Sequence, residues 1–146
     1  MQNYKNILLA SDFSEIGRQV TVRAKLVADQ FGAQLSVLHV VEYVPLLDPA
    51  TIAFDPYILT GPDQLVFDAA IHQLIEIGES LDIPDERLFF ENGQAKQVIV
   101  RVAKQHGFDL IVIGTHGRGG IAALLGSTAT SVIMHAPCDV LTVGLT

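Results

Sequence analysis

The chain contains very little cysteine. Its 146 residues include only Cys138, so no disulfide can form within the chain. Cys138 lies beside the apolar run at residues 140–143, and no cluster of metal-ligating residues surrounds it. A free cysteine in such a place is usually a small, buried, apolar side chain. The sequence therefore predicts neither a disulfide scaffold nor a metal site.

Long hydrophobic runs are also missing. No stretch approaches the 18 apolar residues of a membrane-spanning helix. Residues 1–6 lack the charged and then apolar pattern of a signal peptide. We therefore expect a soluble, cytoplasmic protein.

Positive charge is scarce. Nine Lys and Arg residues stand against 16 Asp and Glu residues, which gives a formal net charge of -7. This balance argues against binding to duplex nucleic acid or to an anionic membrane surface. It does not exclude a small anionic ligand held by a local positive site.

Several familiar site motifs are absent. The sequence has no G-x-x-x-x-G-K-[ST] P-loop, no G-x-G-x-x-G after the first predicted strand and no G-x-S-x-G elbow. The five histidines are not spaced as metal ligands, and no nucleophile is paired with a base. His39, inside a predicted strand, is interpreted as a hydrogen-bonded core residue. Efficient catalysis is therefore not expected.

What remains is an apolar chain with a regular pattern. Apolar residues make up 49% and charged residues 17%, so we expect one globular domain over residues 1–146. Short apolar runs alternate with amphipathic stretches. The pattern predicts strands at 7–10, 35–41, 87–90, 109–113 and 139–143, and helices at 15–31, 63–81, 95–106 and 127–135, with Ser14 as N-cap of the first helix and a turn at 91–94. Strict alternation favours a three-layer α/β fold, a parallel sheet covered by helices on both faces.

Residues 42–62 break the pattern. Four prolines punctuate this stretch and no period holds, which indicates a long loop. It is rich in apolar residues. Two interpretations stand: the loop covers its own core or a partner subunit, or it is a lid beside a ligand site.

The most distinctive stretch is residues 114–128, which follow the fourth predicted strand. Its glycines, Gly117, Gly119 and Gly120 among them, suit a backbone that presents N–H groups to phosphate oxygens. Arg118 could add a charge-assisted contact, and residues 126–128 open the last helix. If the first strand is central, the loop after it, which contains Asp12, faces this stretch. Asp12 then accepts hydrogen bonds from a base amine or a ribose hydroxyl.

Each of these residues also has a plainer interpretation. Ser127 can simply cap the last helix, and Asp12 can be a capping or turn residue. The case for a ligand site comes from the convergence of the two loops.

Five stretches of the sequence form a recognisable set of motifs: Asp12-Phe13-Ser14, Leu38-His39-Val40, the run from Gly114 to Gly120, Leu125-Gly126-Ser127 and the tail at 135–141. Together they resemble the universal stress protein (UspA) family. The resemblance covers the whole chain. It implies an adenine nucleotide alpha hydrolase-like, Rossmann-like fold with strand order 3-2-1-4-5, and a homodimer joined through the last strand, residues 139–145.

The resemblance also implies ATP or another adenine nucleotide as ligand, with or without Mg²⁺. The nucleotide-contacting residues carried over by position are Ala10, Ser11, Asp12, Val40, Gly114, Gly117, Arg118, Gly126, Ser127 and Thr128. The family's nucleotide-binding branch usually reads G-x2-G-x9-G-[ST]. Here eight residues separate Gly117 from Gly126, one fewer than that pattern.

Three functions follow from the residues and the resemblance. The first is a stress-response regulator that binds an adenine nucleotide, which the glycines and Ser127 favour. The second is a homodimeric stress adaptor without a nucleotide, with an unknown downstream protein partner, which the shortened spacing favours. The third is a slow ATPase, against which the missing base–nucleophile pair counts.

Overall fold

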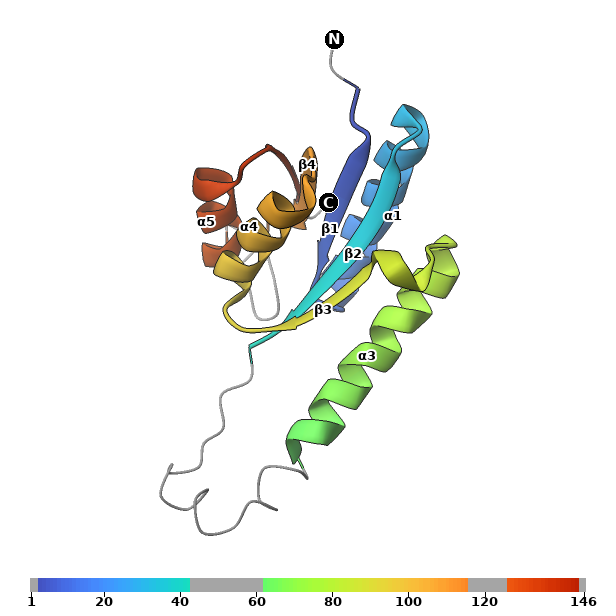
Figure 1. Cartoon of the computed structure of the whole chain (residues 1–146), viewed down its shortest axis with the longest axis vertical. Coiled ribbons are helices and arrows are strands. Elements are labelled where there is room, and N and C mark those ends of the chain that lie inside the picture. The colour runs from blue at the N-terminus through green and yellow to red at the C-terminus, as the bar shows by residue number, and fades with distance from the viewer. Residues whose placement is uncertain (1–2, 43–61, 116–125, 145–146) are drawn as a thin grey trace.

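The computed structural model describes residues 3–42, 62–115 and 126–144 (Figure 1). Strands and helices alternate along these ranges. Their order is β1 (Asn6–Ser11), α1 (Glu15–Phe31), β2 (Gln34–Val41), α3 (Pro62–Leu81), the 3-10 turn η2 (Asp85–Arg87), β3 (Leu88–Asn92), α4 (Ala95–His106), β4 (Leu110–Gly114), α5 (Ser127–His135) and β5 (Asp139–Val143).

The five strands form one parallel sheet in the order β3-β2-β1-β4-β5. This confirms the α/β fold class and the strand order 3-2-1-4-5. Helices α1 and α3 cover one face of the sheet, and α4 and α5 cover the other (Figure 1). The chain changes direction across the sheet between β1 and β4, which makes their carboxyl ends the switch point of the fold.

The core consists of two apolar layers, one on each face of the sheet. Ile7 and Leu9 of β1 point into the layer under α1 and α3, and Leu8 points into the layer under α4 and α5. All three are fully buried because β1 is the central strand. The short apolar run that predicted this strand is therefore explained by cover on both faces.

The predicted helix ends agree well with the structure. Ser14 caps α1, and its Oγ accepts a hydrogen bond from the Gly17 N–H at 2.9 Å. Gly32 and Gly107 end α1 and α4 in the left-handed conformation, with φ of 62° and 67°. Helices α4 and α5 have the predicted bounds.

Two predictions need correction. Residues 91–94 were expected to be a turn, but Glu91 and Asn92 belong to β3, because they continue the ladder with Val40 and Val41 of β2. Cys138 is half-buried instead of fully buried, although it packs against the core under α4 and α5. The loop predicted at 42–62 falls almost wholly on residues 43–61, which lie outside the described ranges.

Candidate functional site

The sheet opens at the predicted switch point. β1 and β4 pair from Ile7 and Leu110 as far as Leu9 and Val112, yet β1 continues to Ser11 and β4 to Gly114. A hollow of about 140 Å³ lies at this opening. The described residues that line it are Ala10, Ser11, Asp12, Gly17, Val20, Leu38, Val40, Ala95, Ile99, Ile113, Gly114 and Thr128.

A larger hollow of about 670 Å³ adjoins the first. Asp12, Val40, Ala95 and Thr128 line both, so the two form one continuous site. Six of the ten predicted site residues line the smaller hollow: Ala10, Ser11, Asp12, Val40, Gly114 and Thr128. Among the described residues of both hollows, the ionisable side chains are those of Asp12, His39 and Glu42.

Asp12 is held firmly by the loop that carries it. Its Oδ1 accepts hydrogen bonds from the Ser14 N–H at 3.0 Å and from the Ser14 hydroxyl at 2.6 Å. Asp12 therefore acts as a turn residue, which is the plainer interpretation that the sequence allowed. A carboxylate has acceptor capacity on both oxygens, so Oδ2 is left to receive a donor from a ligand.

Gly17 provides the space for this carboxylate. A Cβ at residue 17 would lie 2.7 Å from Asp12 Oδ1, closer than real Cβ contacts. Gly17 lines the smaller hollow, and sequence reasoning did not select it. A glycine in the first turn of an otherwise amphipathic helix is the signal that could have identified it, because glycine there lowers helix propensity.

The backbone of Val40 lies where β1 ends. The Gln34 N–H donates to the Lys5 carbonyl, so even-numbered residues of β2 turn their backbone groups toward β1. The β1–β2 ladder finishes at the pair Ser11 and His39. The Val40 carbonyl therefore faces the end of β1, beside the hollow that Val40 lines.

Helices α4 and α5 both begin beside the crevice, and their N-termini differ. At α4, the Ala95 N–H donates to Glu42 Oε1 at 2.6 Å, so a carboxylate already occupies this end. At α5, the N-cap is Gly126, which has no side chain to cap the first turn, and that turn has no acidic residue. An anion is therefore better accommodated at α5 than at α4.

The start of α5 is tied to the end of β4. The Gly126 N–H donates to the Thr115 carbonyl at 2.6 Å, and a Cβ at Gly126 would lie 3.0 Å from that oxygen. Ser127 is the first residue of α5 and is exposed, so the capping role weighed for it belongs to Gly126. Gly126 and Ser127 thus lie next to Thr128, which lines the hollow.

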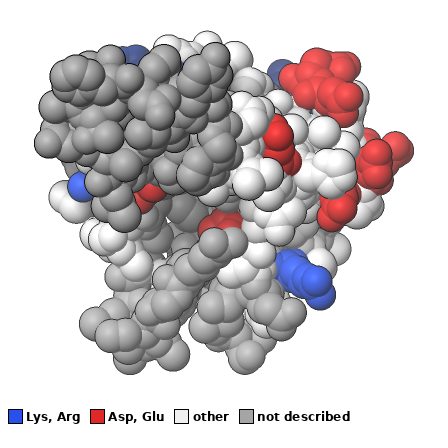
Figure 2. All heavy atoms as spheres, turned by 90° about the horizontal axis from the view of Figure 1, so that it is seen from below, with Lys and Arg blue, Asp and Glu red and all other residues white. Residues whose placement is uncertain are grey.

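Two predicted site residues, Gly117 and Arg118, lie outside the described residues. Figure 2 views the molecule from the end at which the parallel strands finish. Among the described residues, acidic side chains gather at one side of this end, and basic side chains are fewer. Within the described ranges, no three His, Cys, Asp or Glu side chains are grouped to hold a metal. No helix described is long and apolar enough to cross a membrane.

Comparison with known proteins agrees with this architecture. The model of the universal stress protein family matches residues 3–144. Universal stress protein A homolog 1 from Coxiella burnetii is 36% identical over 141 residues, which cover 97% of this chain and 96% of that protein. The solved structure of UspA from Lactobacillus plantarum is 28% identical, with a TM-score of 0.72 and coverage of 98% of this chain and 99% of that one.

A further solved structure, a universal stress protein in complex with cAMP, shares the fold at 20% identity. Its TM-score is 0.61, and the match covers 98% of both chains. The family model and the Coxiella relative both extend over nearly the whole sequence. This chain therefore belongs to the universal stress protein family.

Proposed function

We propose that this protein is a stress-response regulator that binds an adenine nucleotide, ATP or AMP, in the crevice between the loops after β1 and β4. The observation that carries the proposal is the opening of the sheet at this point. One side of the opening offers the oriented acceptor Asp12, and the other offers the uncapped start of α5.

The nucleoside end of the ligand is assigned to the β1 and β2 side of the crevice. The Val40 backbone provides a carbonyl suited to the amine of adenine, and Ala10 and Ser11 line the same hollow. Asp12 Oδ2 accepts from a ribose hydroxyl, because Oδ1 already accepts two hydrogen bonds from Ser14. The apolar side chains of Leu38 and Ile99 cover the base.

The phosphate end is assigned to α5. The N–H groups of Ser127 and Thr128 lie in its first turn, where partial positive charge favours an anion, and their hydroxyls add donors. Gly114 and Gly126 let the backbone come close to the phosphates. Gly117 and Arg118 are assigned to the phosphates from their positions in the sequence.

A member of the family supports the choice of ligand. The neighbour solved with cAMP has the same fold, and cAMP is an adenine nucleotide. The crevice here has the donors and acceptors for such a molecule. We further propose that the protein is a homodimer joined through residues 139–145, because β5 is an edge strand of the sheet.

Two measurements test nucleotide binding. The purified protein is denatured and the released small molecules are analysed, and then ATP and AMP are titrated by calorimetry. We expect a released adenine nucleotide or a dissociation constant below the millimolar range. No released nucleotide and no heat at millimolar ATP would instead support the adaptor without a nucleotide.

A matched pair of variants tests the phosphate assignment. Ser127→Ala removes a hydroxyl from the first turn of α5 and is expected to weaken AMP binding about three- to tenfold. Ser80→Ala removes an exposed hydroxyl at the far end of α3, where it donates to the Ile77 carbonyl, and should leave binding unchanged. Equal AMP affinity in the two variants would contradict the assignment. If the wild-type protein releases phosphate from ATP and Asp12→Ala abolishes that release, the slow ATPase is favoured.

A further inference from the structure

We propose that the stacked side chains of Phe13 and His39 position the Asp12 carboxylate for the ribose of its ligand. This proposal rests on the proposed function, because it explains how the acceptor in the crevice is kept in place. It gives a role to Phe13 and His39, neither of which was selected as a site residue.

The backbone of Phe13 has an unusual conformation. Its φ is 61°, in the left-handed region that bulky side chains rarely adopt. In the described part of the chain, the other non-glycine residue with positive φ is Asp82, at 57°. Such a conformation persists where the surroundings enforce it, and it is concentrated at binding sites. At Phe13, the contacts of the side chain enforce this conformation.

Two contacts hold the Phe13 ring. It stacks on the His39 ring, with centroids 3.8 Å apart and planes inclined by 24°. It also packs against the buried core under α1 and α3. The aromatic ring is thus fixed between a side chain of β2 and the core.

His39 is itself fixed to the end of β1. Its Nδ1 lies 2.7 Å from the Ser11 carbonyl oxygen. A carbonyl oxygen only accepts, so Nδ1 carries the proton in this hydrogen bond. His39 is hydrogen-bonded, as the sequence predicted, but it is half-buried and not in the core. It joins β2 to the residue just before Asp12.

The left-handed turn at Phe13 determines where the Asp12 carboxylate lies. It brings residue 14 back toward residue 12, so that the Ser14 N–H and hydroxyl both reach Asp12 Oδ1. The same Ser14 hydroxyl then caps α1 through the Gly17 N–H. If Phe13 relaxed to an ordinary conformation, Ser14 would move away and the carboxylate would lose its two fixed donors.

The location of the pair agrees with an indirect role. Asp12 lines both hollows of the crevice. Of these two hollows, Phe13 and His39 line the larger and not the smaller. Phe13 also lines a groove of about 430 Å³ between α1 and α3. The ring pair is therefore absent from the lining of the smaller hollow, to which the nucleoside is assigned, and its effect on the ribose contact runs through the Asp12 carboxylate.

The variant Phe13→Gly tests the proposal with adenosine and adenine as probes. Glycine removes the ring and adopts positive and negative φ about equally well, so nothing enforces the left-handed turn and Asp12 loses its fixed position. We expect adenosine affinity to fall about tenfold and adenine affinity, which does not depend on a ribose contact, to stay unchanged. Asp82→Gly changes the other left-handed residue, away from the crevice, and should alter neither affinity. Unchanged adenosine binding in Phe13→Gly, or an equal loss for both probes, would overturn the proposal.

Amide hydrogen exchange tests the positioning without any ligand. The Ser14 and Gly17 N–H groups report the two hydrogen bonds that depend on the turn. We expect both to exchange at least about tenfold faster in Phe13→Gly and at the wild-type rate in Asp82→Gly. Unchanged exchange in Phe13→Gly would overturn the positioning role, whereas failure of the wild-type protein to bind adenosine would overturn the proposed function.

Two variants of His39 separate its stacking from its hydrogen bond. His39→Phe keeps an aromatic ring against Phe13 and removes the donor to Ser11, and His39→Asn keeps a donor and removes the ring. We expect each to speed the exchange of the Ser14 N–H several-fold. Wild-type exchange in both variants would exclude His39 from the positioning role.

Discussion

At the scale of single residues, the site depends on small side chains as much as on polar ones. Gly17 leaves the room that Asp12 Oδ1 occupies, and Gly126 allows its own N–H to approach the Thr115 carbonyl. The sequence shows the second glycine as part of a glycine-rich stretch. It shows Gly17 only as an ordinary helix residue, because glycine is needed there for a contact with the side chain of Asp12, five residues earlier.

Gly17→Ala should weaken AMP binding by about tenfold with little change in stability. The new methyl group displaces Asp12 Oδ1, while alanine improves helix propensity by up to about 1 kcal/mol. Gly78→Ala is the matched control, since its Cβ would lie 2.7 Å from Leu88 Cδ1, between α3 and β3. That variant should lower the unfolding free energy by about 1–3 kcal/mol and leave AMP affinity unchanged. Calorimetry measures AMP affinity, and denaturant titration measures the unfolding free energy. Weaker AMP binding in Gly78→Ala together with unchanged AMP binding in Gly17→Ala would contradict this role for Gly17.

A second residue-scale prediction concerns alkaline pH. The hydrogen bond from the Tyr4 hydroxyl to Asp139, at 2.8 Å, raises the pKa of Tyr4 above its usual 10.0. Burial, with the charges of Asp139 and Asp109, raises the pKa of the Cys138 thiol above 9.0. Both groups therefore hold their protons more tightly in the folded state than in the unfolded state.

Stability should follow from this difference in proton binding. The contribution is complete below about pH 9 for Cys138 and below about pH 10 for Tyr4. It is lost as pH rises from these values through the higher pKa values of the folded state, because the unfolded chain releases its protons first. Thermal unfolding between pH 8 and 11 measures the decline. Tyr4→Phe together with Cys138→Ala should flatten it, and an equally steep decline in that double variant would contradict the assignment.

At the scale of elements, the ends of helices organise the crevice. The α1 cap begins at Ser14, the start of α4 holds Glu42, and the start of α5 lacks a side-chain cap. Ser14→Ala should lower the unfolding free energy by about 1 kcal/mol, since the Gly17 N–H loses its acceptor. Urea titration measures this change. Ser80→Ala, at an exposed site in α3, is the control, and a loss no larger than in that variant would count against the cap.

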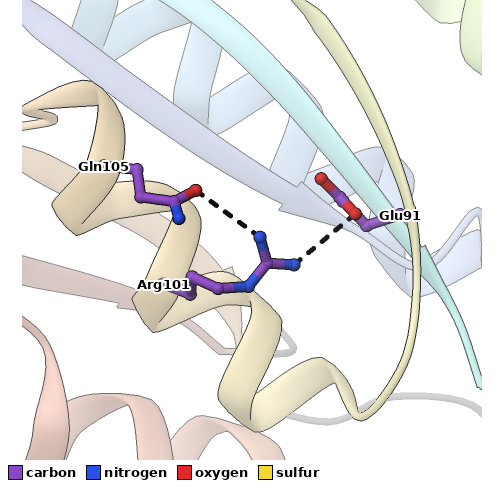
Figure 3. A network of polar contacts seen from close by, with 3 residues as sticks. All are labelled: Glu91, Arg101 and Gln105. Carbon is purple, nitrogen blue, oxygen red and sulfur yellow. Dashed lines mark hydrogen bonds and ion pairs between the residues drawn. The ribbon is translucent and has the colours of Figure 1, made fainter.

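The polar contact between α4 and β3 should matter much less. Arg101 lies 3.5 Å from Glu91 Oε2 and 3.5 Å from Gln105 Oε1 (Figure 3). Its side chain is 46% exposed and that of Glu91 is 36% exposed, so water and salt screen the ion pair. Arg101→Ala should change the unfolding free energy by less than about 0.5 kcal/mol. A loss above about 1 kcal/mol in urea titration would show that the pair is stronger than its exposure implies.

Much of the fold could be predicted from the sequence at this scale. The alternation of apolar runs and amphipathic stretches gave all five strands, and Ser14, Gly32 and Gly107 marked helix ends. The end of β3 was missed because Glu91 and Asn92 are polar, and their place in the strand comes from pairing with β2. The Phe13–His39 stack could not be predicted either, since it joins residues 26 positions apart through tertiary structure.

At the scale of the whole molecule, β5 is one of the two edge strands of the described sheet, the other being β3. The Thr115 N–H donates to the Val143 carbonyl, so Val143 faces β4 and the alternate residues Val140 and Thr142 turn their backbone groups outward. Exposed large apolar side chains on α5, Ile133 and Met134, add to the surface on this side of the molecule. These features support the proposed homodimer.

Thr142→Pro should convert the dimer to a monomer. Proline removes an outward N–H while leaving the groups that Val143 directs toward β4. Thr142→Val is the control, because it changes the side chain and keeps the N–H. Analytical ultracentrifugation measures the species present. A wild-type monomer, or a dimer that persists in Thr142→Pro, would contradict pairing through this edge.

The central claim is that an adenine nucleotide occupies the crevice between β1 and β4. Titration of AMP into isotope-labelled protein, followed by amide NMR shifts, tests it most directly. The account predicts the largest shifts at Ser11–Ser14, Val40, Gly114 and the first turn of α5, with residues 76–81 of α3 and the Tyr4 region little affected. No shifts at millimolar AMP, or the largest shifts at residues 76–81 of α3, would contradict it.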